Sequence, residues 1–188
     1  MKRASLILLM GVFFMMPQRV FSGEHGKFAV FAGGCFWCMQ PPYDSLDGVL
    51  STTVGYTGGT MPAPSYEDVS TGRTGHVEAV RIEYDPQKVS YRDLLKIFFR
   101  SIDPTDPGGQ FVDRGSQYET AIFYADEGQK HEAEAAKKEL EASGRFKKPV
   151  ATRILPAAPF YPAEAEHQQY YKTHSLRYKL YKAGSGRE

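Results

Sequence analysis

Two cysteines three positions apart are the residues of this sequence with the clearest chemical potential. Cys35 follows the pair Gly33-Gly34, and Cys38 comes one helical turn later. A cysteine in the first turn of a helix lies where backbone N–H groups and the helix dipole favour the thiolate, its reactive form. We therefore expect Cys35 to be a nucleophile. Cys38 would share its helix face and condense with an oxidised Cys35 as the resolving thiol.

The same pair has other interpretations. A disulfide between Cys35 and Cys38 would close a very small loop, and disulfide stabilisation grows with loop length, so a purely structural bridge would gain little. A zinc site is disfavoured because the two cysteines and five histidines lack the spacing of metal ligands. The main rival enzyme is a thiol–disulfide oxidoreductase, which also has Cys-x-x-Cys at a helix start. The non-enzyme alternative is a small secreted binding domain with one disulfide.

Two large aromatic residues, Phe36 and Trp37, separate the cysteines. Such residues are usually part of the core, but beside a reactive sulfur they would also form an apolar pocket. Their bulk fills the space between the cysteines, which makes simple dithiol exchange the weaker interpretation.

A carboxylate lies on the apolar face of a predicted strand. Over residues 77–84, alternation puts Glu78 on the same face as Val80 and Ile82. Charged residues are usually solvated, so an exposed carboxylate or a salt-bridge partner is the plain interpretation. A carboxyl group among apolar neighbours would instead have a raised pKa and keep a proton to donate near neutral pH.

The N-terminal segment has the pattern of a secretory signal peptide. Lys2 and Arg3 precede an apolar run over residues 4–16, and Val20 and Ser22 have the spacing of a cleavage site. A membrane anchor is disfavoured because a spanning helix needs about 20 apolar residues, and this run is shorter. We expect residues 1–22 to be removed and the mature protein to be periplasmic or secreted.

Residues 23–188 are expected to form one catalytic domain, since their number fits the range of about 100–200 residues for a single domain. The 23 basic and 22 acidic side chains nearly cancel, so charge gives no reason to expect nucleic acid or a membrane surface as a partner. We expect a monomer without stable membrane association after signal cleavage.

Hydrophobic periodicity and turn residues predict loosely alternating strands and helices, typical of a mixed α/β or α+β sandwich. Ser90 and Asp93 have capping-box spacing at the start of one helix. Strands are expected over residues 27–32, 49–56, 77–84, 119–125 and 150–155. Helices are expected over residues 35–46, 91–101, 127–143 and 164–174, followed by a disordered end over residues 184–188.

Five motifs resemble the A-type peptide methionine sulfoxide reductases and occur in that family's order. The resemblance covers residues 28–170, and five ordered motifs are difficult to obtain by chance, whereas a lone cysteine pair would not suffice. The motifs are Gly34-Cys35-Phe36-Trp37, Gly55-Tyr56-Thr57-Gly58-Gly59, Pro64-Ser65-Tyr66, Gly75-His76-Val77-Glu78-Ala79-Val80 and Asp113-Arg114-Gly115-Ser116-Gln117-Tyr118.

The resemblance implies that Cys35 attacks the sulfur of methionine-S-sulfoxide, releases methionine and becomes a sulfenic acid. Phe36 and Trp37 would hold the methyl group of the substrate. The preference for the S epimer is implied by the resemblance alone.

Four further residues receive roles from the resemblance. Glu78 would donate a proton to the sulfoxide oxygen, while Tyr66 and Tyr118 would hydrogen-bond to that oxygen. Asp113 would position the substrate or the tyrosines. Without the resemblance, the two tyrosines would be ordinary packed or surface residues and Asp113 a turn residue.

The resemblance also implies a ferredoxin-like α/β sandwich core, with a mixed sheet flanked by helices and long loops around the site. It is closest to the Cys-Phe-Trp-Cys members of the family. Because no cysteine follows Cys38, Cys38 takes the resolving role that many relatives give to cysteines near the C-terminus. Gln40 stands where relatives often have Glu, and the sequence offers no mechanistic reason for this difference.

The expected substrates are oxidised proteins or peptides, and also free methionine sulfoxide. No metal or organic cofactor is expected, since the reductant would be an external thiol, either a thioredoxin-like protein or dithiothreitol. An exported enzyme would need such a donor on its own side of the membrane.

Overall fold

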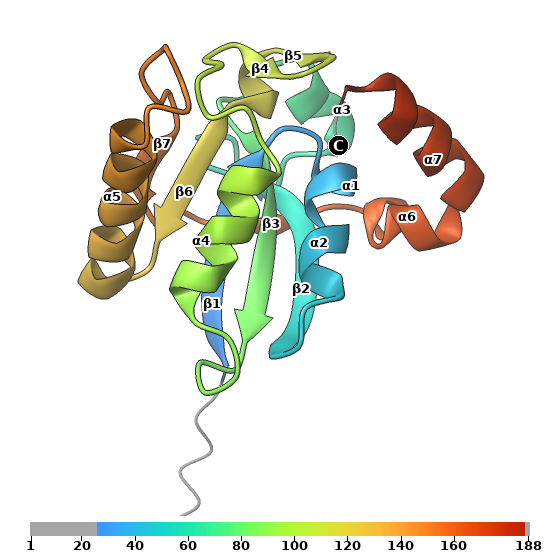
Figure 1. Ribbon diagram of the computed structural model, residues 1–188. Helices are drawn as coiled ribbons and strands as arrows, with labels where there is room; N and C mark the ends of the chain where they lie inside the picture. The colour runs from blue at the N-terminus through green and yellow to red at the C-terminus, as the bar shows by residue number, and fades with distance from the viewer. Residues whose placement is uncertain (1–25, 187–188) are drawn as a thin grey trace, which may run out of the picture.

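A six-stranded mixed β-sheet forms the centre of the protein in the computed structural model, which describes residues 26–186 (Figure 1). The strand order across the sheet is β7-β6-β1-β3-β2-β8. Neighbouring strands are antiparallel except β6 and β7, which are parallel. The strands are β1 (Lys27–Gly33), β2 (Val49–Thr57), β3 (Val77–Tyr84), β6 (Thr120–Tyr124), β7 (Arg153–Pro156) and β8 (Tyr161–Pro162).

Four central strands form a ferredoxin-like unit. Strand β1 is followed by the short helices α1 (Phe36–Met39) and α2 (Pro41–Asp44), and β3 is followed by helix α4 (Tyr91–Arg100) and then β6. This βαββαβ unit has the strand order β6-β1-β3-β2. Helix α5 (Glu127–Ala142) provides the crossover that the parallel strand β7 requires. The predicted α+β class with a ferredoxin-like core is confirmed.

The helices cover one face of the sheet, where the larger part of the core lies (Figure 1). Side chains alternate between the two faces of a strand, so Phe31 of β1 and Val80 and Ile82 of β3 point toward α4. They pack there with Leu94 and Phe98, and all five are fully buried. Because Glu78 belongs to the same alternating set, β3 carries this carboxylate to the helix-covered face.

Residues 157–160 cross the opposite face of the sheet. They connect β7 and β8, which lie at the two outer edges of the sheet. Phe160 packs against the buried cluster of Ala79 and Phe123, and the guanidinium of Arg81 lies 4.9 Å from the centre of its ring. This crossing brings the C-terminal part of the chain to the edge where β8 pairs with β2.

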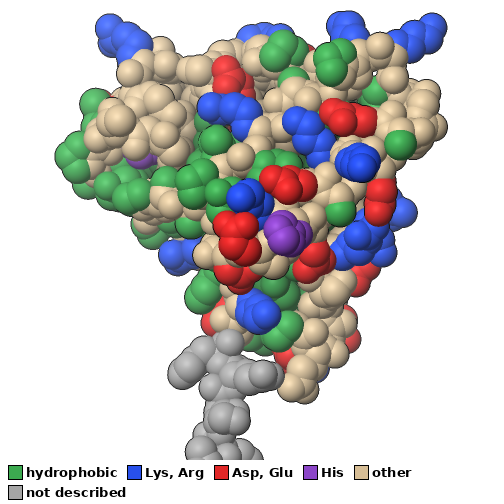
Figure 2. All heavy atoms as spheres, turned by 90° about the vertical axis from the view of Figure 1, so that its left-hand side faces the viewer, with side chains coloured by type: hydrophobic (Ala, Val, Ile, Leu, Met, Phe, Trp, Pro, Cys, Tyr) green, Lys and Arg blue, Asp and Glu red, His purple; other side chains and the backbone are tan. Residues whose placement is uncertain are grey.

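The helices predicted over residues 91–101 and 127–143 are confirmed as α4 and α5. Helix α4 begins after Ser90, whose hydroxyl accepts the backbone N–H of Asp93 as the capping-box spacing predicts. Helix α5 begins after Asp126, which caps Gln129 in the same way. Over the face that α5 presents to solvent, positive and negative side chains are interspersed, so this face offers no patch of one charge (Figure 2).

The continuous helix predicted over residues 35–46 is wrong. The structure has two helices of four residues, α1 and α2, with Gln40 between them as the C-cap of the first and the N-cap of the second. Pro41 has no backbone N–H and is tolerated only at the start of a helix, so the chain begins a second helix there.

The C-terminal predictions need three corrections. The strand expected over residues 150–155 is β7 (Arg153–Pro156), and it is followed by β8. The helix expected over residues 164–174 is a 3₁₀ turn, η2 (Ala165–His167), and a short helix, α6 (Tyr170–Thr173), because Gln169 adopts a left-handed backbone conformation with a φ of 49°. A last helix, α7 (Ser175–Gly184), was not predicted, and Ser185 beyond it is 1% exposed rather than part of a disordered end.

Short elements complete the fold above the sheet in Figure 1. They are α3 (Tyr66–Ser70), the two-stranded ribbon of β4 (Gly109–Gln110) and β5 (Asp113–Arg114), and the 3₁₀ turn η1 (Ser116–Tyr118). The predicted signal peptide over residues 1–22 lies outside the described residues. Within residues 26–186, no helix has the length and apolar character needed to cross a membrane.

Candidate active site

The two cysteines meet where β1 ends and α1 begins. Gly34 turns the chain after β1 with a φ of 81°, a conformation that favours glycine. Cys35 is the N-cap of α1, and its carbonyl accepts the backbone N–H of Cys38 at 3.0 Å. Both cysteines are free thiols, each 6% exposed, and the two side chains are in hydrogen-bonding contact. The two sulfurs therefore lie close together on one helical turn, as the spacing of the cysteines predicts.

Glu78 lies directly beside the nucleophile. Its Oε2 accepts the backbone N–H of Phe36, the residue after Cys35, at 2.9 Å. The Glu78 side chain is 2% exposed, at the start of β3 and opposite Tyr56 of β2. The expected burial of this carboxylate is thus observed, and a solvated strand carboxylate is the wrong interpretation.

The expectation that the helix start favours the Cys35 thiolate is wrong for this state of the protein. Burial raises the pKa of the Cys35 thiol well above its usual value, and the contact with Cys38 and the charge of Glu78 raise this pKa further. Helix α1 has only four residues, and the Phe36 N–H at its start is already bonded to a carboxylate. The thiol therefore keeps its proton until another group changes its surroundings.

Tyr66 and Tyr118 reach the same place from two different segments. Tyr66 is the first residue of α3 and Tyr118 the last of η1, and both are half-buried. Burial raises the pKa of each hydroxyl most, and the negative charge of Glu78 raises it next. Cys35 and Asp113 also raise the pKa of both hydroxyls. These five predicted site residues therefore form one electrostatically interacting cluster.

The aromatic residues of the motif have different environments. Phe36 is 1% exposed and packs on Tyr56, so it is also a core residue. Trp37 is only partly buried and stacks on Tyr170 of α6, with ring centres 3.9 Å apart and an angle of 8° between the rings. Its indole N–H donates to Nδ1 of His167 at 3.2 Å. The C-terminal segment thus fixes the orientation of Trp37.

Tyr181 of α7 is the functional candidate that the sequence analysis missed. Its hydroxyl lies 2.7 and 2.6 Å from the two carboxylate oxygens of Asp113 and is also in hydrogen-bonding contact with the Cys35 thiol. The contact with Tyr181 acts to lower the pKa of Cys35, against the effect of burial. Asp113 therefore reaches the nucleophile through Tyr181. No local pattern marks this residue among the 12 tyrosines of the chain.

Gln40 has a structural explanation. Its side-chain amide is 1% exposed, donates to the Thr52 hydroxyl at 2.9 Å and accepts the backbone N–H of Gln169 at 2.8 Å. A carboxylate at this position could accept from Gln169 but not donate to Thr52. The amide therefore joins α1, β2 and the segment before α6.

His76, to which the sequence analysis assigned no chemistry, is buried and positions a loop. Its Nδ1 accepts the backbone N–H of Gly59 at 3.1 Å, and its Nε2 lies 2.8 Å from the carbonyl oxygen of Met61. Both ring nitrogens are therefore used within the loop that precedes Tyr66.

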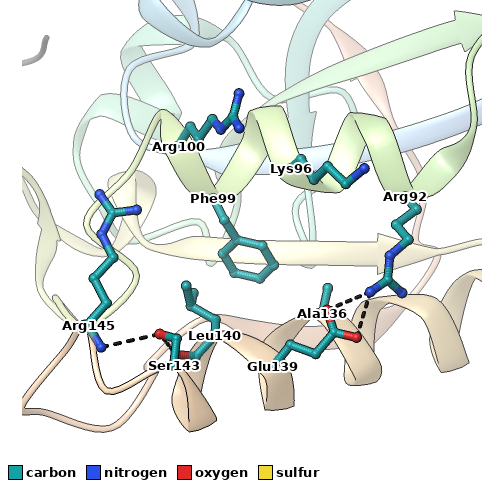
Figure 3. Close-up of a pocket in the computed structure, with 9 residues that line it drawn as sticks. All are labelled: Arg92, Lys96, Phe99, Arg100, Ala136, Glu139, Leu140, Ser143 and Arg145. Atoms are coloured by element: carbon teal, nitrogen blue, oxygen red, sulfur yellow. Dashed lines mark hydrogen bonds and ion pairs between the residues drawn. The ribbon is translucent and has the colours of Figure 1, made fainter.

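A hollow of about 290 Å³ between α4 and α5 lies apart from this cluster (Figure 3). Phe99 and Leu140 form its apolar floor, and Arg92, Lys96 and Arg145 lie at its rim. Since none of the candidate site residues lines it, we do not assign the reaction to it. No group of His, Cys, Asp and Glu within residues 26–186 has the arrangement of a metal site.

A buried dithiol beside a carboxyl group and three tyrosine hydroxyls is suited to thiol-based redox chemistry. The thiol supplies electrons, and the carboxyl and hydroxyl groups donate protons or hydrogen bonds to an oxygen atom. Simple dithiol exchange needs none of these oxygen-directed groups. The fold and the site together define a thiol-dependent oxidoreductase.

Comparison with known proteins identifies which oxidoreductase family this is. The model of the peptide methionine sulfoxide reductase family matches residues 27–188. The peptide methionine sulfoxide reductase MsrA of Bacillus licheniformis is 54% identical over 165 residues, which are 88% of this chain and 91% of that protein. The chain belongs to the peptide methionine sulfoxide reductase family, A type, and is an oxidoreductase acting on methionine sulfoxide.

Solved structures agree with this assignment. The reduced form of Mxr1 from Saccharomyces cerevisiae matches 81% of this chain and 88% of its own, with a TM-score of 0.76 and 31% identity. Mxr1 in complex with Trx2 matches 82% of this chain and 91% of its own, with a TM-score of 0.55 and 25% identity. The shared fold is the ferredoxin-like core described above.

Proposed function

We propose that this protein reduces methionine-S-sulfoxide in oxidised proteins and peptides, and also the free amino acid, through a sulfenic acid on Cys35. The observation that carries the proposal is the convergence on Cys35 of a second thiol and a carboxylate fixed at 2.9 Å from the next backbone N–H. Electrons come from the sulfur, and the proton needed at the sulfoxide oxygen comes from the carboxyl group.

In the first step, the Cys35 sulfur attacks the sulfoxide sulfur while Glu78 gives a proton to the sulfoxide oxygen. Methionine leaves, the hydroxyl group passes to Cys35 as a sulfenic acid, and the original thiol proton restores the acid form of Glu78. One sulfur is oxidised by two electrons and the other is reduced by two, so the step is balanced. Tyr66 and Tyr118 would hydrogen-bond to the oxygen as charge develops on it.

In the second step, the Cys38 thiol attacks the sulfenic acid of Cys35. A disulfide forms between the two cysteines, and the hydroxyl group leaves as water with the Cys38 proton. The contact between the two thiols supports this role, because it requires only a small local adjustment to bring the sulfurs to bonding distance.

Substrate recognition would depend on the aromatic residues that follow the nucleophile. The methyl group of the sulfoxide would lie against the apolar rings of Phe36 and Trp37. Tyr56 packs against Phe36. Tyr170 and His167 hold Trp37 in place. Asp113 would act by orienting the Tyr181 hydroxyl toward Cys35.

Recycling would use a thioredoxin-like protein, as the complex of Mxr1 with Trx2 suggests for a structural relative. No metal or organic cofactor takes part in the proposed cycle, since the two cysteines carry the electrons. We further propose that the protein is exported and acts as a monomer in the periplasm or outside the cell, on the pattern of residues 1–22.

Replacement of the nucleophile tests this proposal. Cys35→Ser should abolish reduction of a methionine sulfoxide peptide with dithiothreitol, while the circular dichroism spectrum and the melting temperature stay near those of the wild-type protein. Residual turnover in this variant, or full activity, would contradict the role of Cys35. A loss of folding in both Cys35→Ser and Cys38→Ser would favour a structural disulfide instead.

A further inference from the structure

A second hollow, of about 470 Å³, leads to Cys38 from outside the candidate active site. We call it the Cys38 groove. Helix α2 and the end of α1 form one wall, α4 forms another, and α7 forms the third. Its lining residues are Cys38, Pro41, Pro42, Ile97, Arg100, Ser101, Tyr178 and Lys182.

We propose that the Cys38 groove is where the reducing protein docks, and that its thiol attacks Cys38 rather than Cys35. This inference rests on the proposed function, because it presupposes the disulfide between Cys35 and Cys38. The proposed partner is a small dithiol protein. Its reactive cysteine lies in an apolar surface that is surrounded by acidic side chains.

Access to the two sulfurs is the first argument. Both cysteines are 6% exposed, so an incoming thiol needs an opening that ends at one of them. Cys38 lines the groove and Cys35 does not. None of the predicted substrate-side residues lines it either; these are Phe36, Trp37, Tyr66, Glu78, Asp113 and Tyr118. The reductant can therefore reach Cys38 without displacing groups that hold the sulfoxide.

The chemistry of the walls is the second argument. Pro41, Pro42 and Ile97 give the groove an apolar part next to the sulfur. Arg100 and Lys182 supply two positive charges, and within residues 26–186 neither side chain has an ion-pair partner. Arg100 also lines the hollow between α4 and α5 that Figure 3 shows. Unpaired cations around an apolar floor suit a partner with acidic groups around an apolar contact.

The exchange is balanced as follows. The first thiol of the reducing protein loses its proton and attacks the Cys38 sulfur, and the bond between Cys35 and Cys38 breaks. Cys35 leaves with a proton as a thiol, and Cys38 is held in a mixed disulfide. The second thiol of the reductant then attacks the sulfur of the reductant's first cysteine in this mixed disulfide. A disulfide forms within the reductant, and Cys38 is released as a thiol. Two electrons and two protons pass to the reductase.

Charge reversal at the groove tests the docking. The double variant Arg100→Glu/Lys182→Glu is compared with Lys138→Glu/Lys179→Glu, which makes the same change in net charge at exposed positions of α5 and α7 outside the groove. With thioredoxin, thioredoxin reductase and NADPH as the reducing system, we expect the KM for thioredoxin to rise at least about fivefold in the groove variant only. High salt should shrink the difference between wild type and groove variant.

The same variants assayed with dithiothreitol separate this inference from the proposed function. We expect both double variants to match the wild-type rate with dithiothreitol. An equal loss with dithiothreitol and thioredoxin would overturn the docking of a protein, because the groove would then affect the chemistry itself. An unchanged KM for thioredoxin in the groove variant would also overturn it, while leaving sulfoxide reduction intact.

The attacked sulfur can be identified directly. Thioredoxin with its second cysteine replaced by serine cannot complete the exchange, so it should accumulate as a mixed disulfide with the oxidised reductase. Peptide mass spectrometry should find the linkage at Cys38. A linkage at Cys35 would overturn the proposal.

Discussion

The backbone N–H of Phe36 donates a hydrogen bond of 2.9 Å to Oε2 of Glu78. The residue that follows the nucleophile thereby holds the carboxyl group of β3 against the first turn of α1. Since Glu78 is 2% exposed, this contact replaces water as its hydrogen-bond donor. The same bond holds the proton donor beside Cys35. Phe36 and Glu78 are 42 residues apart in the chain, too far for a local sequence pattern to relate them.

Removal of the carboxyl proton should slow the reaction without disturbing this contact. Glu78→Gln keeps an oxygen that accepts the Phe36 N–H but has no acidic proton. We expect the rate of methionine release in a single turnover to fall by about 10²–10⁴-fold, the usual contribution of a general acid. Glu83→Gln on the same strand, where the carboxylate bonds to the Ser51 hydroxyl, is the control and should keep the wild-type rate. A loss in Glu78→Gln no greater than in this control would rule out the acid role.

Loss of the Tyr181 hydroxyl should make Cys35 harder to ionise. The Tyr181 contact lowers the pKa of Cys35, whereas burial raises it. In a Cys38→Ser background, alkylation of Cys35 by iodoacetamide should have its midpoint above the usual thiol value of about 8.5. Tyr181→Phe should move the midpoint to still higher pH. Tyr171→Phe, which removes a hydroxyl bonded to Asp44, should leave it in place. A midpoint that moves to lower pH in Tyr181→Phe would contradict this assignment.

A reductase without the second cysteine should stop after one turnover with a protein reductant. In Cys38→Ser we expect about one methionine per enzyme, and the sulfenic acid on Cys35 should be trapped by a dimedone-type reagent. The wild-type protein should give many turnovers under the same conditions and little trapped product. Continued turnover of Cys38→Ser with thioredoxin would show that another group resolves the sulfenic acid.

Substrate binding should weaken in acid because His167 must be neutral to accept the indole N–H of Trp37. Burial lowers the pKa of His167 below its usual 6.5, so at neutral pH its Nδ1 is an acceptor. As the pH falls through this lowered pKa, Nδ1 becomes a donor and the bond is lost. We expect the KM for a methionine sulfoxide peptide to rise about fivefold, equivalent to roughly 1 kcal/mol for one hydrogen bond.

Two variants check this pH dependence. In His167→Gln, the KM should no longer depend on pH over this range, because no group at that position titrates. His131→Gln, at an exposed position of α5, should keep the wild-type profile. If His167→Gln kept the acid rise in KM, the titrating group would lie elsewhere.

Local signals in the sequence predicted the parts of the fold that depend on short-range interactions. Helix α4 follows from the Ser90 cap and the apolar spacing after it, and β3 follows from alternation that also placed Glu78 among buried residues. The motifs around Cys35, Tyr66 and Tyr118 identified a set of residues that the structure brings together.

Features that depend on distant parts of the chain were not predictable in this way. The pKa of Cys35 is raised by burial and by the charge of Glu78, which lies on another strand. The sequence shows only a helix start, which would lower this pKa. Tyr181 reaches Cys35 because residues 157–160 carry the chain across the sheet to β8, at the edge beside β2. The break at Gln169 needs a left-handed backbone that is held by a bond from its N–H to Gln40.

The central claim is tested most directly by the fate of each epimer of a methionine sulfoxide peptide. The purified, reduced protein is incubated with the peptide and dithiothreitol, and the S and R epimers are followed separately by chromatography. We predict complete loss of the S epimer, equimolar formation of the methionine peptide and an unchanged R epimer. Persistence of both epimers with a folded and reduced protein would contradict the account and favour dithiol exchange as the activity of the cysteine pair.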